Sequence, residues 1–204
     1  FSDPLAAVLA AGGALAGLLA RQRTGQGVHL DCSQREMLAS VMGSALMDYA
    51  MNSRVATAQG NDDPTKIVQG CFPCRGERGW VTIAIDTEEA WQRLCGVLGR
   101  PGWTREPRFA DPEQRRQHRQ EVQELLAQWT RSRTKFEVTQ QLQAAGIAAG
   151  PVLSAKELFE DAHLRERGFF EVCTHPEAGT HPYYGRPMQF TKTPLRNHRP
   201  APCF

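Results

Sequence analysis

The sequence predicts a mixed α/β fold, and three observations support that class. Long segments with apolar residues at helical spacing alternate with short β-rich segments, of which WVTIAI at 80–85 is the clearest. Glycine, proline and polar residues gather between these segments, most densely at 53–70. Apolar residues make up 41% of the 204 residues and charged residues 23%, so the chain can bury a sizeable core.

The first expected element is a helix over residues 4–20. It follows Asp3 and Pro4, a pair typical of a helix start with Asp as N-cap and Pro at the first helical position. The run is apolar on all sides but shorter than the about 20 strongly apolar residues of a membrane span, so we expect a helix buried inside a protein. Four small residues would let neighbouring elements approach it closely: Ala10, Gly13, Ala14 and Gly17.

Three further elements are expected before residue 70. Gly25 should end the first helix, because basic residues occupy the preceding turn and glycine is common just after a helix. A short strand is expected at 28–33 and a helix at 34–52, where apolar residues recur at helical spacing. The polar segment 53–70 is expected to be a linker or a long loop.

The middle of the chain is expected to hold the strand at 80–85 and three helices, at 87–99, 113–130 and 134–145. Thr87 is the expected cap of the first, and Thr134 with Glu137 forms a capping box at the start of the third. An extended stretch, a helix capped by Ser154 and short strands near 168–173 and 188–191 should follow.

Composition and charge limit the partners and the compartment. The net charge is only +2 and like-charged runs are short, so we expect no nucleic-acid partner and no membrane. The six cysteines are scattered and no secretory signal precedes them, which favours free thiols and a cytoplasmic location. The sequence starts without Met and stops at RPAPCF, so we expect it to belong to a longer protein.

Asp3 is the leading candidate for chemistry, and two interpretations of it stay open. Its carboxylate could cap the helix, and the positive end of the helix dipole would keep it ionised and fixed in place. Carboxylates of this kind also serve as covalent nucleophiles. The spacing of the residues does not decide between these roles, which are compatible with each other.

Two other groups are candidates for a metal or redox site. Cys71 and Cys74 form a C-x-x-C pair, but structural zinc needs four ligands and no second pair is present, so packed free cysteines are expected. His175 and His181 lie on a Pro- and Gly-rich segment that predicts a surface turn. No metal site is therefore expected, and no P-loop, G-x-G-x-x-G or G-x-S-x-G motif occurs.

Several motifs, in order, resemble the class III CoA-transferase family, the group of carnitine CoA-transferase and formyl-CoA transferase. SDPLAAVLAAGGALAGLLARQRTGQGVHLDCSQRE resembles the segment in which Asp precedes a small-residue helix and R-x-x-TG-x-G-x-x-x-D-x-S. CFPCRGERGWVTIAI, WQRLCGVLGRP, REPRFADPEQRRQHR, LQAAGIAAGPV, DAHLRERGFF and GRPMQFTKTP resemble later family segments. The similarity covers nearly the whole chain.

The resemblance implies a fold, a reaction and an assembly. It implies the C-terminal part of the family fold: the end of a Rossmann-like CoA-binding domain at 1–54, a small α+β domain at 55–160 and a return segment at 161–204. Asp3 matches the family's nucleophile. The reaction would proceed through a mixed anhydride and an aspartyl-CoA thioester of this residue. The substrates would be acyl-CoA and a carboxylic acid acceptor, with no covalently bound cofactor. Family members form interlocked homodimers, and their CoA-gripping residues have no identified counterpart here, so the chain alone should be inactive.

Two alternatives remain beside the transferase. α-Methylacyl-CoA racemases share the fold and use the same Asp to move a proton. At the place where this chain has AIDTEEAW, they carry a segment similar to AIEPQF, and this difference favours the transferase. A non-catalytic half of a tandem protein, in which Asp3 only caps the helix, is the other alternative.

Overall fold

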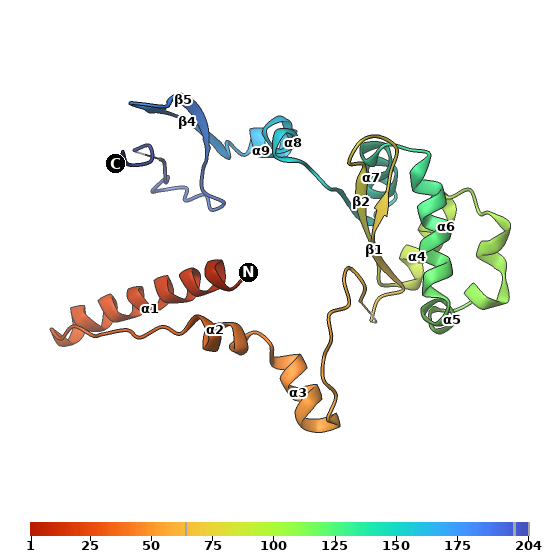
Figure 1. The fold of residues 1–204 in the computed structure, drawn as a ribbon, viewed down its shortest axis with the longest axis horizontal. Coiled ribbons are helices and arrows are strands. Elements are labelled where there is room, and N and C mark those ends of the chain that lie inside the picture. Colours follow the sequence, from red (N-terminus) through yellow and green to blue (C-terminus); the bar gives the residue numbers. More distant parts are fainter. Residues whose placement is uncertain (64, 198, 204) are drawn as a thin grey trace. The chain divides into compact units, whose positions relative to one another are not determined.

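The computed structural model describes residues 1–63, 65–197 and 199–203 (Figure 1). Its contacts divide the chain into two compact units, Phe1–Gly60 and Asn61–Phe204. The first unit contains helices, and the second contains helices and two antiparallel sheets. The predicted mixed α/β class is confirmed, whereas the predicted boundaries at 54 and 160 stay a prediction.

The first unit begins with the long helix α1, Ser2–Thr24. It ends as predicted: Gly25 has a φ of 76° and donates its N–H to the Arg21 carbonyl. The predicted start is wrong, because Phe1 occupies the N-cap position and makes no side-chain capping hydrogen bond. Proline fits anywhere in a first turn, where its missing N–H costs no helical hydrogen bond, so Pro4 does not fix the first residue.

Helix α1 is exposed over most of its surface, which corrects the expectation of a helix buried on all sides. Ala6 is its buried residue, and Val8 is 70% exposed. Leu15 and Leu19 are likewise exposed, by 63% and 57%. Among the described helices, α1 is long and apolar enough to cross a membrane, but core helices of soluble proteins pass the same test, so no membrane assignment follows.

Small residues of α1 let the following segment approach, as predicted. A Cβ built on Gly17 would lie 2.8 Å from Val28 Cγ2, and one on Gly13 would lie 3.7 Å from Leu30 Cδ1. The predicted strand at 28–33 is absent. A strand requires a hydrogen-bonded neighbour, and the described part of this unit contains none, so the segment runs along the helix instead.

The predicted helix at 34–52 is interrupted. It forms α2, Gln34–Ser40, and α3, Gly43–Asn52. Val41 lies at φ −98° and ψ 2°, outside the helical range, and Gly43 follows closely. β-Branched residues and glycine have low helix propensity, which favours a break at this point.

The second unit contains a three-stranded antiparallel sheet in the order β1-β2-β3, formed by Val68–Pro73, Trp80–Ile85 and Ala148–Pro151. Phe72 pairs with Val81, and Ile83 pairs with Ala149. The strand β2 matches the prediction to the residue. The strand β1 corrects it, because its first residues belong to the segment interpreted as a linker.

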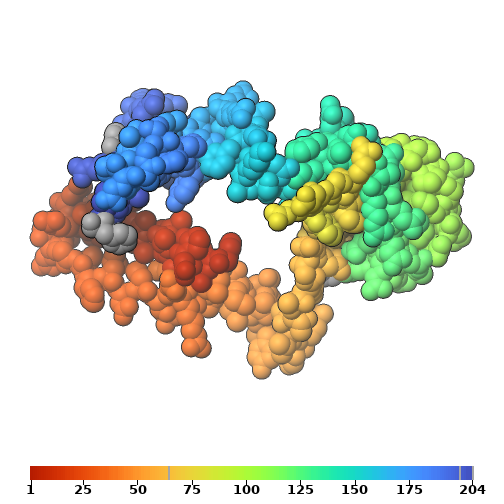
Figure 2. Space-filling view, turned by 45° about the horizontal axis from the view of Figure 1, so that its top comes forward, coloured from red at the N-terminus to blue at the C-terminus, as the bar shows by residue number. Residues whose placement is uncertain are grey.

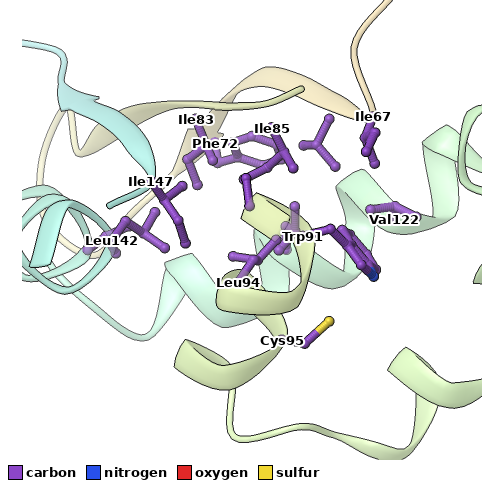
Figure 3. Close-up of a cluster of buried hydrophobic side chains, with 14 of the residues drawn as sticks. Ile67, Phe72, Ile83, Ile85, Trp91, Leu94, Cys95, Val122, Leu142 and Ile147 are labelled. Atoms are coloured by element: carbon purple, nitrogen blue, oxygen red, sulfur yellow. The ribbon is translucent and has the colours of Figure 1, made fainter. Parts of the chain in front are cut away.

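Four helices accompany this sheet: α4 Glu88–Val97, α5 Pro112–Gln117, α6 Arg119–Arg131 and α7 Lys135–Ala144, with 3₁₀ turns at Gly102–Arg105 and Pro107–Phe109. Figure 2 shows the yellow strands in contact with the green and teal helices. Alternate residues of β2, Val81, Ile83 and Ile85, are buried, as one face of a strand requires. They share one core with side chains such as Trp91 and Leu142 (Figure 3).

The helix caps in this unit follow the sequence closely. The Thr87 hydroxyl accepts the N–H of Ala90, and Thr134 and Glu137 form both bonds of a capping box. Ser154 and Glu157 form a second capping box at the start of α8, Ala155–Glu160. The predicted helix at 113–130 is wrong in one respect: His118, at φ −100° and ψ 25°, separates it into α5 and α6.

The C-terminal part contains α9, Ala162–Glu166, and a hairpin of β4, Phe170–His175, and β5, Gly179–Tyr184. The strand expected near 168–173 is therefore present, two residues later. The strand expected at 188–191 is absent. The partner of β4 is the segment after the turn at 176–178, which lies close enough in sequence to form a hairpin.

A shielded ion pair ties α8 to α7. Lys135, which is buried, donates to the carbonyl of Val152 and to Glu157 Oε2, both at 2.8 Å. The same carboxylate accepts the N–H and the hydroxyl of Ser154. The Lys135 ammonium, followed by the Ser154 donors, lowers the pKa of Glu157 from 4.5 to about 2.

This ion pair predicts a pH-dependent stability. The pKa of Glu157 is depressed in the folded state, so its stabilising effect is fully present above about pH 4.5 and is lost as the pH falls toward 2. Urea unfolding should therefore show Glu157→Gln less stable than the wild type at pH 7, with the gap closing between pH 4.5 and 2. Glu160→Gln, on the same short helix, is the control. An unchanging gap would contradict the prediction.

Candidate functional site

Asp3 lies in the first turn of α1 and its side chain is exposed. Its carboxylate accepts a long hydrogen bond, 3.4 Å, from the hydroxyl of Ser2. No backbone N–H caps onto it among the described residues. The structure thus removes the capping role that the sequence left open and leaves the carboxylate oxygens accessible.

The position of Asp3 still has an electrostatic consequence. The unpaired N–H groups of a helix start carry a partial positive charge, which favours a carboxylate there by about 0.3–1 kcal/mol. Arg21, eighteen residues on, lies about 27 Å away along the axis at 1.5 Å per residue, and cannot assist the same reacting atoms. The separation of Asp3 from Arg21 therefore spans most of the helix and allows no contact between them.

The C-x-x-C pair does not form a reactive site in this structure. Cys71 is half-buried and Cys74 is buried, and both are free. Burial raises the pKa of both thiols, which disfavours the thiolate needed for redox or metal chemistry. Within residues 1–63, 65–197 and 199–203, no group of three or more His, Cys, Asp or Glu side chains could hold a metal ion.

The two histidines lie on the β4–β5 hairpin, where a surface turn was predicted. His175 Nδ1 accepts the N–H groups of Glu177 and Ala178, each at 3.1 Å. His181 Nε2 lies 2.5 Å from the carbonyl of Ala178. These local bonds hold the turn together, as a surface turn requires.

The accessible carboxylate of Asp3 can act as a nucleophile without a neighbouring base. A serine or a thiol must lose a proton before it attacks, whereas a carboxylate already carries the reacting lone pair. The N–H groups of the helix start are donors that could stabilise a developing oxyanion. Acyl transfer onto a carboxylate oxygen is one chemistry that is open to such an arrangement.

Comparison with known proteins gives one family. The model described as CoA-transferase family III matches residues 1–204. The probable CoA-transferase Rv1866 of Mycobacterium tuberculosis is 34% identical over 190 residues, which are 93% of this chain and 24% of that protein. The succinyl-CoA–D-citramalate CoA-transferase of Chloroflexus aurantiacus is 32% identical over 87% of this chain and 44% of its own length.

Solved structures have the same fold. A CAIB/BAIF family protein from Brucella suis superposes with a TM-score of 0.83 at 22% identity, over 100% of this chain and 52% of that one. Rv3272 of M. tuberculosis gives a TM-score of 0.73 over 95% of this chain and 50% of its own. The chain thus spans about half the length of these structures and less than half of the curated relatives described above.

Proposed function

Because the chain belongs to CoA-transferase family III, we propose that it supplies the nucleophilic carboxylate of an acyl-CoA:carboxylate CoA-transferase. Asp3 is the proposed nucleophile. The observation that carries this proposal is its carboxylate in the first turn of α1, exposed and without a capping hydrogen bond. A homodimer, which the family resemblance implies, and a cytoplasmic location, which the scattered cysteines favour, are further proposals.

The proposed reaction proceeds through covalent intermediates on Asp3. An Asp3 oxygen attacks the thioester carbonyl of the donor, the C–S bond breaks, and CoA thiolate leaves a mixed anhydride behind. The thiolate then attacks the aspartyl carbonyl, which expels the donor acid and gives an aspartyl-CoA thioester. The acceptor carboxylate displaces the thiolate to form a second anhydride, and the thiolate attacks its acyl carbon, which restores Asp3.

The proposed acceptor is a small carboxylic acid. The names of two relatives pair a CoA thioester with such an acid: succinyl-CoA with D-citramalate, and formyl-CoA with oxalate. This chain is about 32% identical to each of them, which supports the substrate class and leaves the individual acid open.

Trapping of the acylated enzyme tests the proposal. The whole protein is incubated with an acyl-CoA and hydroxylamine, which converts an aspartyl thioester or anhydride to a stable hydroxamate, and its peptides are analysed by mass spectrometry. We expect the hydroxamate on Asp3. Asp48→Asn, which removes another carboxylate of the first unit, a half-buried one paired with Arg54, should label as the wild type does.

Two outcomes would overturn the nucleophilic role. One is labelling that is absent from Asp3 while CoA transfer proceeds. The other is deuterium incorporation at the α carbon of the acyl-CoA without transfer to a second acid, which would indicate proton abstraction by a racemase-like enzyme.

A further inference from the structure

A cavity of about 380 Å³ lies in the C-terminal part of the second unit. Three arginines from separate segments line it: Arg167 after α9, Arg186 after β5, and Arg196 beyond them. One carboxylate, Glu171 of β4, also lines it. The volume falls within the range of small-molecule sites, roughly 300–1,000 Å³.

A close backbone approach lies next to residues that line this cavity. Gly185 donates its N–H to the carbonyl of Phe169 at 2.6 Å, and a Cβ on Gly185 would lie 2.5 Å from that oxygen. Only glycine permits this approach, which places Arg186 at the wall next to β4. The chain beyond is held as well, because the N–H of Asn197 donates to Glu171 Oε2 at 2.6 Å.

The positive charge of the cavity is only partly balanced. Three arginines and one glutamate leave a formal excess of two positive charges. Glu171 Oε1 lies 3.9 Å from Arg186 Nη1, beyond hydrogen-bond distance. Arg186 Nη1 is buried and has no hydrogen-bond partner in the part of the chain that the structure describes. A charged donor removed from water without an acceptor costs free energy, which an anion in the cavity would recover.

The rest of the lining is mixed. Met188, Phe190 and Leu195 are its large apolar side chains, each of them exposed, and Gln189 and Thr191 are polar. Arginine side chains bind the oxyanion of an organic acid, and apolar side chains next to them contact its carbon skeleton.

We propose that this cavity binds a small organic dianion, whose oxyanions the guanidinium groups of Arg167, Arg186 and Arg196 neutralise. A charge of −2 matches the +2 excess. This chemistry has two sources, a free dicarboxylate or the phosphate monoester of coenzyme A. Naming a dicarboxylate and coenzyme A as the two sources rests on the proposed function. The anion site itself rests on the arginines of the cavity alone.

Isothermal titration distinguishes the sources. The protein is titrated with succinate, with CoA, and with dephospho-CoA, which lacks only the phosphate monoester. Binding of succinate identifies a dicarboxylate site. If CoA binds and dephospho-CoA binds much more weakly, the phosphate monoester is the group that the cavity binds.

Variants connect the binding to the cavity. Arg186→Gln should raise the Kd of the bound probe at least ~10-fold, because it removes a charged donor. Arg131→Gln, an exposed arginine outside the cavity, should change it by less than about twofold, since exposed charges are screened. If Arg186→Gln fails to fold, Arg196→Gln, whose side chain is exposed, replaces it.

The proposal is overturned if the wild type binds none of the three probes, or if the cavity variants and Arg131→Gln behave alike. Asp3→Asn should bind the same probe with wild-type affinity. A failure of the transferase mechanism would therefore leave this result unchanged, and the two proposals can fail separately.

Discussion

Asp3→Asn is expected to lower kcat for CoA transfer by at least ~10³-fold, because the amide cannot form the anhydride or the thioester. The affinity for acyl-CoA should be nearly unchanged, since only the reacting oxygen is altered. The measurement is the steady-state exchange of CoA between an acyl-CoA and a carboxylic acid by the whole protein, with donor binding measured separately by titration.

Stability measurements separate catalysis from folding in this variant. The carboxylate makes no capping hydrogen bond, so its loss should cost only the interaction with the helix dipole, about 0.3–1 kcal/mol. Asp3→Ala should lose activity equally and cannot revert by deamidation. Turnover at the wild-type rate in both variants would leave Asp3 without a catalytic role and favour the non-catalytic alternative.

Arg115→Ala is expected to destabilise the second unit by about 3–5 kcal/mol, because it removes a buried side chain together with the hydrogen bonds that this side chain donates. Arg115 is 1% exposed and donates to the carbonyls of Phe109 and Ala110, at 2.7 and 3.0 Å. It also pairs with Glu88 at 2.5 Å and lies over the ring of Trp91 at 4.4 Å. Alanine would leave two carbonyls without donors and a cavity beside the ring.

The neighbouring arginine provides a matched control for this prediction. Arg116 pairs with Glu113 at the surface of the same helix, so Arg116→Ala should cost less than about 0.5 kcal/mol. Urea unfolding at pH 7 measures both variants. An NMR titration adds a local readout, because Arg115 lowers the pKa of Glu88 and its loss should return that pKa toward 4.5. Equal stabilities of the two variants would contradict the prediction.

Elements with strong local signals were predictable from the sequence. The strand β2 alternates buried and exposed side chains, and Thr134 and Ser154 carry capping boxes that depend on four consecutive residues. Such signals are local, so no tertiary information is needed to read them. The family resemblance was also predictable and is confirmed by the match over residues 1–204.

Elements that depend on distant partners were not predictable in the same way. The segment at 28–33 has strand composition but no neighbouring strand in its unit, while β1 contains Gln69, Gly70 and Cys71 and is a strand because β2 pairs with it. The arginine-lined cavity draws on residues from 167 to 196 and required the close approach at Gly185. The catalytic role of Asp3 stays a prediction.

The order of the three-stranded sheet has a consequence for biosynthesis. The hairpin β1–β2 is complete once Ile85 has left the ribosome, but β3 begins only at Ala148. While the intervening helices are translated, the outer edge of β2 has no hydrogen-bonded neighbour. An open strand edge can pair with another nascent chain, so this interval is when the polypeptide is most exposed to misassembly.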